Sequence, residues 1–86
     1  MEKDQEFLTD LVRSLVNFPL DVEVTRKSDD MGVLLILKVN PQDMGLVIGK
    51  SGSTASAIRT LLRTVGMKNK ARVSMRIEEP VSVPTE

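Results

Sequence analysis

Residues 47–58 have the sequence VIGKSGSTASAI, and this stretch decides the fold class. Two glycines, Gly49 and Gly52, enclose Lys50 and Ser51 and form a G-x-x-G motif. Glycine interrupts helices and removes side-chain bulk, so a nucleic-acid backbone can approach the main chain closely at such a motif. Because a bare G-x-x-G motif is common by chance, its meaning depends on the elements around it.

The residues on both sides of the motif indicate helices. Asn40 is suited to cap a helix, Pro41 fits the first helical position, and Asp43 is favourable to the helix dipole. The helix that they open is short because the motif interrupts it. A second helix is predicted over residues 53–65, and Gly66 is expected to end it. The motif therefore lies in a loop between two helices.

The second helix is predicted to have a polar and an apolar face. Arg59 and Arg63 are four residues apart, which makes them neighbours on the polar face. Helical spacing places five apolar residues on another side, namely Ala55, Ile58, Leu61, Leu62 and Val65. We expect this apolar side to pack against the rest of the domain.

The rest of the chain supplies one more helix and three strands. Apolar residues recur at helical spacing over residues 4–16, whereas residues 21–26 alternate between apolar and polar side chains. Residues 33–39 form a nearly continuous apolar run, typical of a buried strand, and the turn residues before it predict a hairpin. Residues 71–78 alternate strictly and predict the last strand. The order is α-β-β-α-α-β, which is an α+β domain.

The length and composition exclude most enzyme classes. The 86 residues form one small domain, which we assign to residues 1–79, and we expect residues 80–86 to be a disordered tail. The absence of Cys and His excludes thiol nucleophiles, disulfides, Cys/His zinc sites and the Ser-His-Asp triad. A nucleotide-binding P-loop would need a strand before the loop and a glycine at position 44, where Met44 stands. We therefore expect no enzymatic activity, no metal and no cofactor.

The formal net charge of zero hides an uneven distribution. Residues 49–76 contain seven basic side chains and no acidic one, whereas residues 1–48 carry a net charge of −4. Such a basic run suits a polyanion, because neutralised phosphates release counterions. The same run is also compatible with a solvated face that pairs with the acidic N-terminal half. Charge alone leaves both interpretations open.

With the motif and the order of elements established, the chain resembles the type II KH family. The stretch over residues 43–62, DMGLVIGKSGSTASAIRTLL, looks like that of the small single-domain bacterial KH proteins of the KhpA type. The likeness extends over residues 4–78. It implies a type II KH fold, in which a three-stranded mixed sheet packs on three helices.

The resemblance also implies a narrow groove that holds about four nucleotides of single-stranded RNA. The backbone contacts expected from the family motif are Gly49, Lys50, Ser51 and Gly52. Only 2% of the residues are aromatic, so the floor under the bases would be aliphatic, and Ile48 is a candidate for it. Arg59 and Arg63 would add cations, whereas Ile58 fits the core better than the floor.

The cellular role is likewise implied by the resemblance alone. It is that of an RNA chaperone in the cytoplasm that affects gene expression, cell shape and envelope homeostasis, including cell wall biogenesis. A lone domain should bind RNA weakly, which favours pairing of modules. The resemblance implies a homodimer, a heteromer with a larger KH-containing protein of the KhpB/Jag type, or both.

Two further points concern location and a rival function. The acidic N-terminus is unlike a signal peptide, and the longest unbroken apolar run, residues 33–37, is too short for a membrane span. We therefore expect a cytoplasmic protein that does not bind membranes. The alternative function is a protein-pairing scaffold, with the helix that carries Leu61 and Leu62 as its interface.

Overall fold

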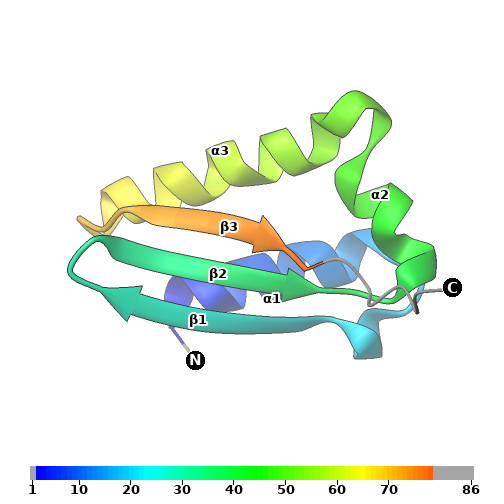
Figure 1. Ribbon diagram of the computed structural model, residues 1–86, viewed down its shortest axis with the longest axis horizontal. Coiled ribbons are helices and arrows are strands. Elements are labelled where there is room, and N and C mark those ends of the chain that lie inside the picture. Colours follow the sequence, from blue (N-terminus) through cyan, green and yellow to red (C-terminus); the bar gives the residue numbers. More distant parts are fainter. Residues whose placement is uncertain (1, 79–86) are drawn as a thin grey trace, which may run out of the picture.

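The structure, a computed structural model, describes residues 2–78. Its helices and strands, in chain order, are α1 (Lys3–Leu15), β1 (Glu23–Asp29), β2 (Gly32–Lys38), α2 (Met44–Ile48), α3 (Ser53–Lys68) and β3 (Val73–Ile77) (Figure 1). Single 3-10 turns precede β1, α2 and α3, namely η1 (Pro19–Asp21), η2 (Pro41–Asp43) and η3 (Lys50–Gly52). The expected tail at residues 80–86 lies outside the described residues.

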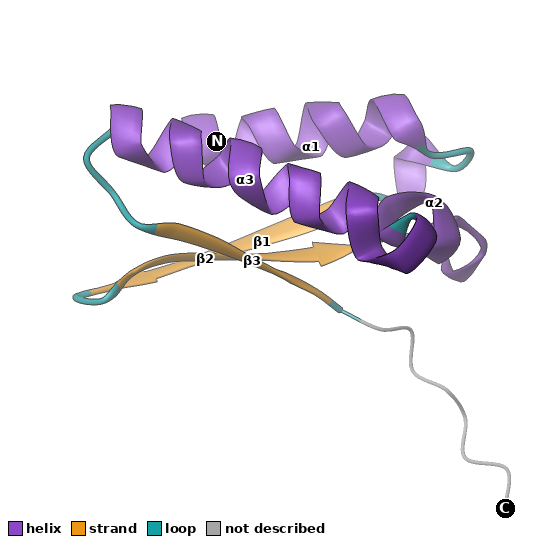
Figure 2. Cartoon of the chain, turned by 90° about the horizontal axis from the view of Figure 1, so that it is seen from above, coloured by secondary structure: helices purple, strands orange, loops and turns teal. Residues whose placement is uncertain are grey.

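The three strands form one mixed sheet in the order β1-β2-β3. The hairpin pairs β1 with β2 antiparallel, so that Asp29 stands opposite Gly32. The strand β3 returns parallel to β2, with Val73 opposite Val33. All three helices lie on one side of this sheet (Figure 2). The predicted element order and the type II KH fold are confirmed.

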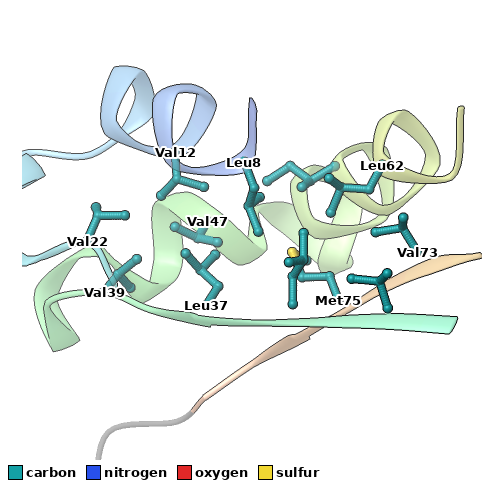
Figure 3. Close-up of a cluster of buried hydrophobic side chains, with 12 residues drawn as sticks. Leu8, Val12, Val22, Leu37, Val39, Val47, Leu62, Val73 and Met75 are labelled. Carbon is teal, nitrogen blue, oxygen red and sulfur yellow. The ribbon is translucent and has the colours of Figure 1, made fainter. Parts of the chain in front are cut away.

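The core fills the space between the sheet and the helices (Figure 3). Leu8 and Leu62 from α1 and α3, Leu35 and Leu37 from β2, and Val47 from α2 are fully buried. Burying one leucine side chain contributes about 1.5–3 kcal/mol relative to leaving it exposed. Because Val47 belongs to the same core, the short helix α2 is held in place by the packing of the whole domain.

A second set of contacts joins α1 to the sheet. Asp4 is buried, and the side chain of Arg26 on β1 donates to its carboxylate, with Arg26 Nε 3.0 Å from Asp4 Oδ1. The side-chain amide of Gln5 donates to the Val24 carbonyl at 2.8 Å. These contacts fix the start of α1 against β1.

Among residues 2–78, no helix is long and apolar enough to cross a membrane.

The prediction that Gly66 ends the second helix is wrong, because α3 continues to Lys68. A Cβ on Gly66 would lie 2.6 Å from the Ala71 carbonyl oxygen and 2.9 Å from Val73 Cγ2. This glycine therefore allows α3 to pack closely against the segment that leads into β3.

The predicted apolar face of α3 is correct except at Leu61. Ala55, Ile58 and Leu62 are buried, whereas the Leu61 side chain is 46% exposed. Successive helical residues are turned by about 100°, so Leu61 points well away from its neighbour Leu62. Of the two leucines proposed as a pairing interface, Leu62 belongs to the core and only Leu61 is accessible.

Candidate nucleic-acid interface

The loop between α2 and α3 depends on its two glycines in different ways. Gly49 has a φ of 76° and Gly52 a φ of 78°, both in the left-handed region that favours glycine. A Cβ on Gly49 would lie 2.7 Å from the main-chain nitrogen of Thr54, whereas a Cβ on Gly52 would meet no atom within 4 Å. Gly49 is therefore required by packing, and Gly52 leaves the main chain open to approach.

The N-terminus of α3 faces this loop. The helix begins at Ser53, and within residues 2–78 no side chain caps its first turn. Main-chain N–H groups and the helix dipole attract anions at such an end. Lys50 and Ser51 are exposed next to it. The N–H groups of Gly52 and Ser53 already donate to the Gly49 and Lys50 carbonyls. The loop thus offers a phosphate group the helix dipole, the Ser51 hydroxyl and the Lys50 cation.

Asp43 fixes the helix that leads into the loop. Its carboxylate is fully buried and accepts the main-chain N–H groups of Asn17 and Phe18, at 3.1 Å and 3.0 Å. The side chain of Asn40 accepts the Gln42 N–H at 2.8 Å, which confirms the predicted cap. Asp43 also lies in the first helical turn, as predicted, and its hydrogen bonds join the start of α2 to the end of α1.

A shallow groove of about 300 Å³ begins beside the loop. Its lining comes from α2, α3 and β3, with Gly52 at the loop end, and consists otherwise of Met44, Ile48, Ala55, Arg59, Arg76 and Ile77. The lining combines aliphatic side chains with two arginines. It can accept bases against its apolar part while phosphates meet the arginines and the loop.

A second hollow of about 590 Å³ continues along α3 and β3, which run side by side in Figure 1. Arg59 lines both hollows, and its Nε donates to the Met75 carbonyl through a long hydrogen bond of 3.5 Å. Arg63 and Met67 from α3 and Arg72 just before β3 line the far end. We call the two hollows together the α3–β3 groove.

The cations of this half of the protein remain available to a ligand. Among the described residues the structure has one ion pair, between Asp4 and Arg26, and both residues lie in the acidic half. All seven basic residues between positions 49 and 76 are exposed. The interpretation of a basic face neutralised by direct pairing with the acidic half therefore loses its support.

The described residues also contain no cluster of three acidic side chains that could hold a metal ion.

The structure brings together most of the residues that the sequence singled out. Ile48, Gly52 and Arg59 line the loop end of the α3–β3 groove, and Arg63 lines its far end. The other three predicted residues, Gly49, Lys50 and Ser51, belong to the adjoining loop rather than to the groove lining. Ile58 is 2% exposed and belongs to the core.

The sequence did not predict that β3 forms one wall of the α3–β3 groove. Arg72, Met75, Arg76 and Ile77 line this wall, and none of them is among the predicted site residues. The strict alternation of residues 71–78 was the available signal, because it separates two arginines from the apolar positions. That this strand borders α3 follows from its parallel pairing with β2 at the edge of the sheet.

Comparisons with known proteins give the family. A family model described as KhpA/KhpB, KH domain, matches residues 5–77. A protein of Leifsonia xyli named RNA-binding protein KhpA is 44% identical over 68 residues, which cover 79% of this chain and 90% of that protein. A protein of the same name from Listeria monocytogenes is 41% identical over 75 residues, 87% of this chain and 99% of that protein.

Solved structures support the fold. A variant of Aquifex aeolicus Era bound to GDP·AlF4− is similar with a TM-score of 0.60 and 16% sequence identity. The match covers 86% of this chain and 29% of that chain, so it shows that a similar fold forms part of a larger protein. The family match, by contrast, spans every helix and strand described above except the first two residues of α1. This chain belongs to the KhpA/KhpB family of KH domains.

Proposed function

We propose that this protein binds single-stranded RNA, with about four nucleotides held in the α3–β3 groove and their backbone against the loop of Gly49, Lys50, Ser51 and Gly52. The observation that carries the proposal is the open main chain at Gly52, placed at a helix start without a side-chain cap and directly beside a groove of aliphatic side chains and two arginines. That arrangement offers the phosphates and the bases separate contacts.

The relatives support RNA as the ligand, since those described above are named RNA-binding proteins. Ile48 and Met44 would lie under bases, and Arg59 and Arg63 would contact phosphate or base edges. The loop has one cation, Lys50, so the affinity of one domain should be modest. The protein would act by binding and not by catalysis.

The cellular part of the proposal follows the family. The protein would serve in the cytoplasm as an RNA chaperone that affects gene expression, cell shape and envelope homeostasis. Weak binding by one module is strengthened when two are joined. We therefore propose a homodimer, a heteromer with a larger KH-containing protein of the KhpB/Jag type, or both.

A second candidate function is protein pairing. An accessible apolar side chain on the outer side of α3 favours it, because Leu61 is 46% exposed and does not line the groove. In that case the α3–β3 groove would be secondary, and the outer side of α3 would be the working surface.

Fluorescence anisotropy with a short labelled single-stranded RNA separates the two functions. The test protein carries Lys50→Asp and Ser51→Asp, and the matched control carries the same changes on α1, Lys3→Asp and Ser14→Asp. All four side chains are exposed. We expect the loop variant to lose binding by on the order of tenfold or more, equivalent to about 1.4 kcal/mol, while the control retains it.

The oligomeric state of both variants is followed by analytical ultracentrifugation. Loss of RNA binding without loss of self-association supports the RNA-binding function. If the two variants bind RNA equally well, the loop is not the contact and the proposal fails. If neither the wild type nor the variants bind RNA but all of them self-associate, pairing is the function.

A further inference from the structure

The face of the sheet that the helices leave uncovered carries a charge pattern of its own. All described helices lie on the other face (Figure 2). Along β2, Leu35 and Leu37 point to the helices and are fully buried, whereas Leu34 and Ile36 alternate with them and are only half-buried. We call the side without helices the open face.

Cations outnumber acids on the open face. By strand alternation it carries Glu23 and Lys27 from β1, Lys38 from β2 and Arg76 from β3, together with Asp29 at the end of β1. Arg72 just before β3 and Glu78 just after it continue the same alternation. The four cations and three acids surround the short apolar centre formed by Leu34 and Ile36.

A hollow of about 270 Å³ lies at the hairpin end of this face. Lys27, Leu34 and Ser74 stand opposite one another on the three strands, and together with Arg72 they line the hollow. Asp29 also lines it, but its carboxylate accepts the Met31 N–H at 2.8 Å within the turn. The hollow thus has a leucine floor between two cations, Lys27 and Arg72.

Arg72 connects this hollow to the α3–β3 groove, because it lines both. Its position is fixed by the main chain, where the Arg72 carbonyl accepts the Val33 N–H at 2.7 Å. An extended chain that leaves the groove at its far end therefore meets Arg72 first and then the open face.

We propose, on the basis of the proposed RNA binding, that an RNA strand longer than the groove continues past Arg72 onto the open face, where Lys27 contacts a phosphate and Leu34 a base. The two cations Lys27 and Arg72, which line the hollow around Leu34, favour RNA over a second protein chain. A stable protein interface buries about 800 Å² per partner around an apolar centre. On the open face the apolar centre consists of only two half-buried side chains, Leu34 and Ile36, with charged residues around them.

The test compares two single-stranded RNAs, one of four and one of ten nucleotides, by fluorescence anisotropy with wild type, Lys27→Glu and the milder Lys27→Gln. The control, Lys3→Glu, makes the same charge change on α1. Both lysines are exposed, and circular dichroism verifies the fold of each variant. We expect Lys27→Glu to weaken binding of the ten-nucleotide RNA by about three- to tenfold and Lys27→Gln by less. Binding of the four-nucleotide RNA should change less than twofold, and the control should match the wild type.

The outcomes separate this inference from the proposed function. If the wild type binds neither RNA, the proposed function fails and the inference fails with it. If the wild type binds both but Lys27→Glu weakens them equally, or weakens neither, RNA occupies the groove and does not extend onto the open face. If Lys27→Glu instead alters self-association in ultracentrifugation, the open face is a protein contact and the inference is wrong.

Discussion

Asp43 shows how a single side chain supports the candidate site without touching a ligand. Its buried carboxylate accepts two main-chain N–H groups from the segment after α1. The substitution Asp43→Asn replaces one acceptor oxygen with a donor, so at least one buried N–H group loses its partner. We expect the free energy of unfolding to fall by about 1–3 kcal/mol, measured by urea denaturation.

The control for this prediction is Asp10→Asn on the exposed side of α1. A surface substitution of this kind should change the stability by less than about 0.5 kcal/mol. Equal effects of the two substitutions would show that the contacts of Asp43 do not stabilise the domain.

The two loop glycines should respond differently to the same substitution. An alanine at either position has an unfavourable positive φ, which costs on the order of 1 kcal/mol. At Gly49 the added methyl group also meets the main chain of Thr54, whereas at Gly52 it meets nothing. Gly49→Ala should therefore lower the melting temperature clearly more than Gly52→Ala. Equal decreases would mean that the loop does not have the packing described here.

At the residue scale, the sequence was sufficient where partners are close in the chain. The Asn40 cap was predicted because its partner, the Gln42 N–H, is two residues away. The contact of Asp43 with Asn17 and Phe18 was missed because it joins residues 25 and 26 positions apart. No local pattern reports such a contact.

At the scale of single elements, α3 is the most informative, because it contributes to both the core and the groove. Leu62 is fully buried and Leu61 is about half exposed. We expect Leu62→Ala to cost about 2–5 kcal/mol of stability, as is typical of buried leucines, and Leu61→Ala about 0.5 kcal/mol or less. Chemical denaturation of both variants measures this difference.

The same pair also bears on the pairing function. If Leu61→Ala dissociates an oligomer at unchanged monomer stability, the outer side of α3 is an interface between chains. A large loss of monomer stability from Leu61→Ala would contradict the orientation of α3 given by the structure.

The helices and strands were predicted better than the contacts between them. Hydrophobic patterns identified α1, α3 and the three strands, whereas the start signals at residues 40–43 and the G-x-x-G motif identified α2 and the loop after it. The role of Gly66 was misjudged, because the reason for that glycine is the close approach of Ala71 and Val73 rather than the end of a helix. The wall formed by β3 was also missed, since the sequence does not state that its outer edge lies beside α3.

The charge distribution belongs to the scale of the whole molecule. The net charge is zero, yet Arg59, Arg63, Arg72 and Arg76 all line the α3–β3 groove. RNA binding should therefore weaken with added salt despite the neutral total. Each phosphate neutralised on a single strand contributes a slope of about −0.7 to log K against log salt.

For a strand of about four nucleotides we expect a total slope of roughly −2 to −3. Anisotropy titrations at several salt concentrations measure it. An oligomer of the same sequence with an uncharged backbone serves as the control and should show almost no slope. Equal slopes for the two ligands would contradict phosphate recognition by these arginines.

The central claim is that the glycine loop and the α3–β3 groove form the RNA-binding site. Titration of the ¹⁵N-labelled protein with a four-nucleotide single-stranded RNA, followed by two-dimensional NMR, tests it most directly. We predict that the largest shifts occur at the amides of residues 48–55 and 73–77, while those of α1 hardly move. Shifts concentrated on α1 or around Leu61, or no shifts at millimolar RNA, would contradict the claim.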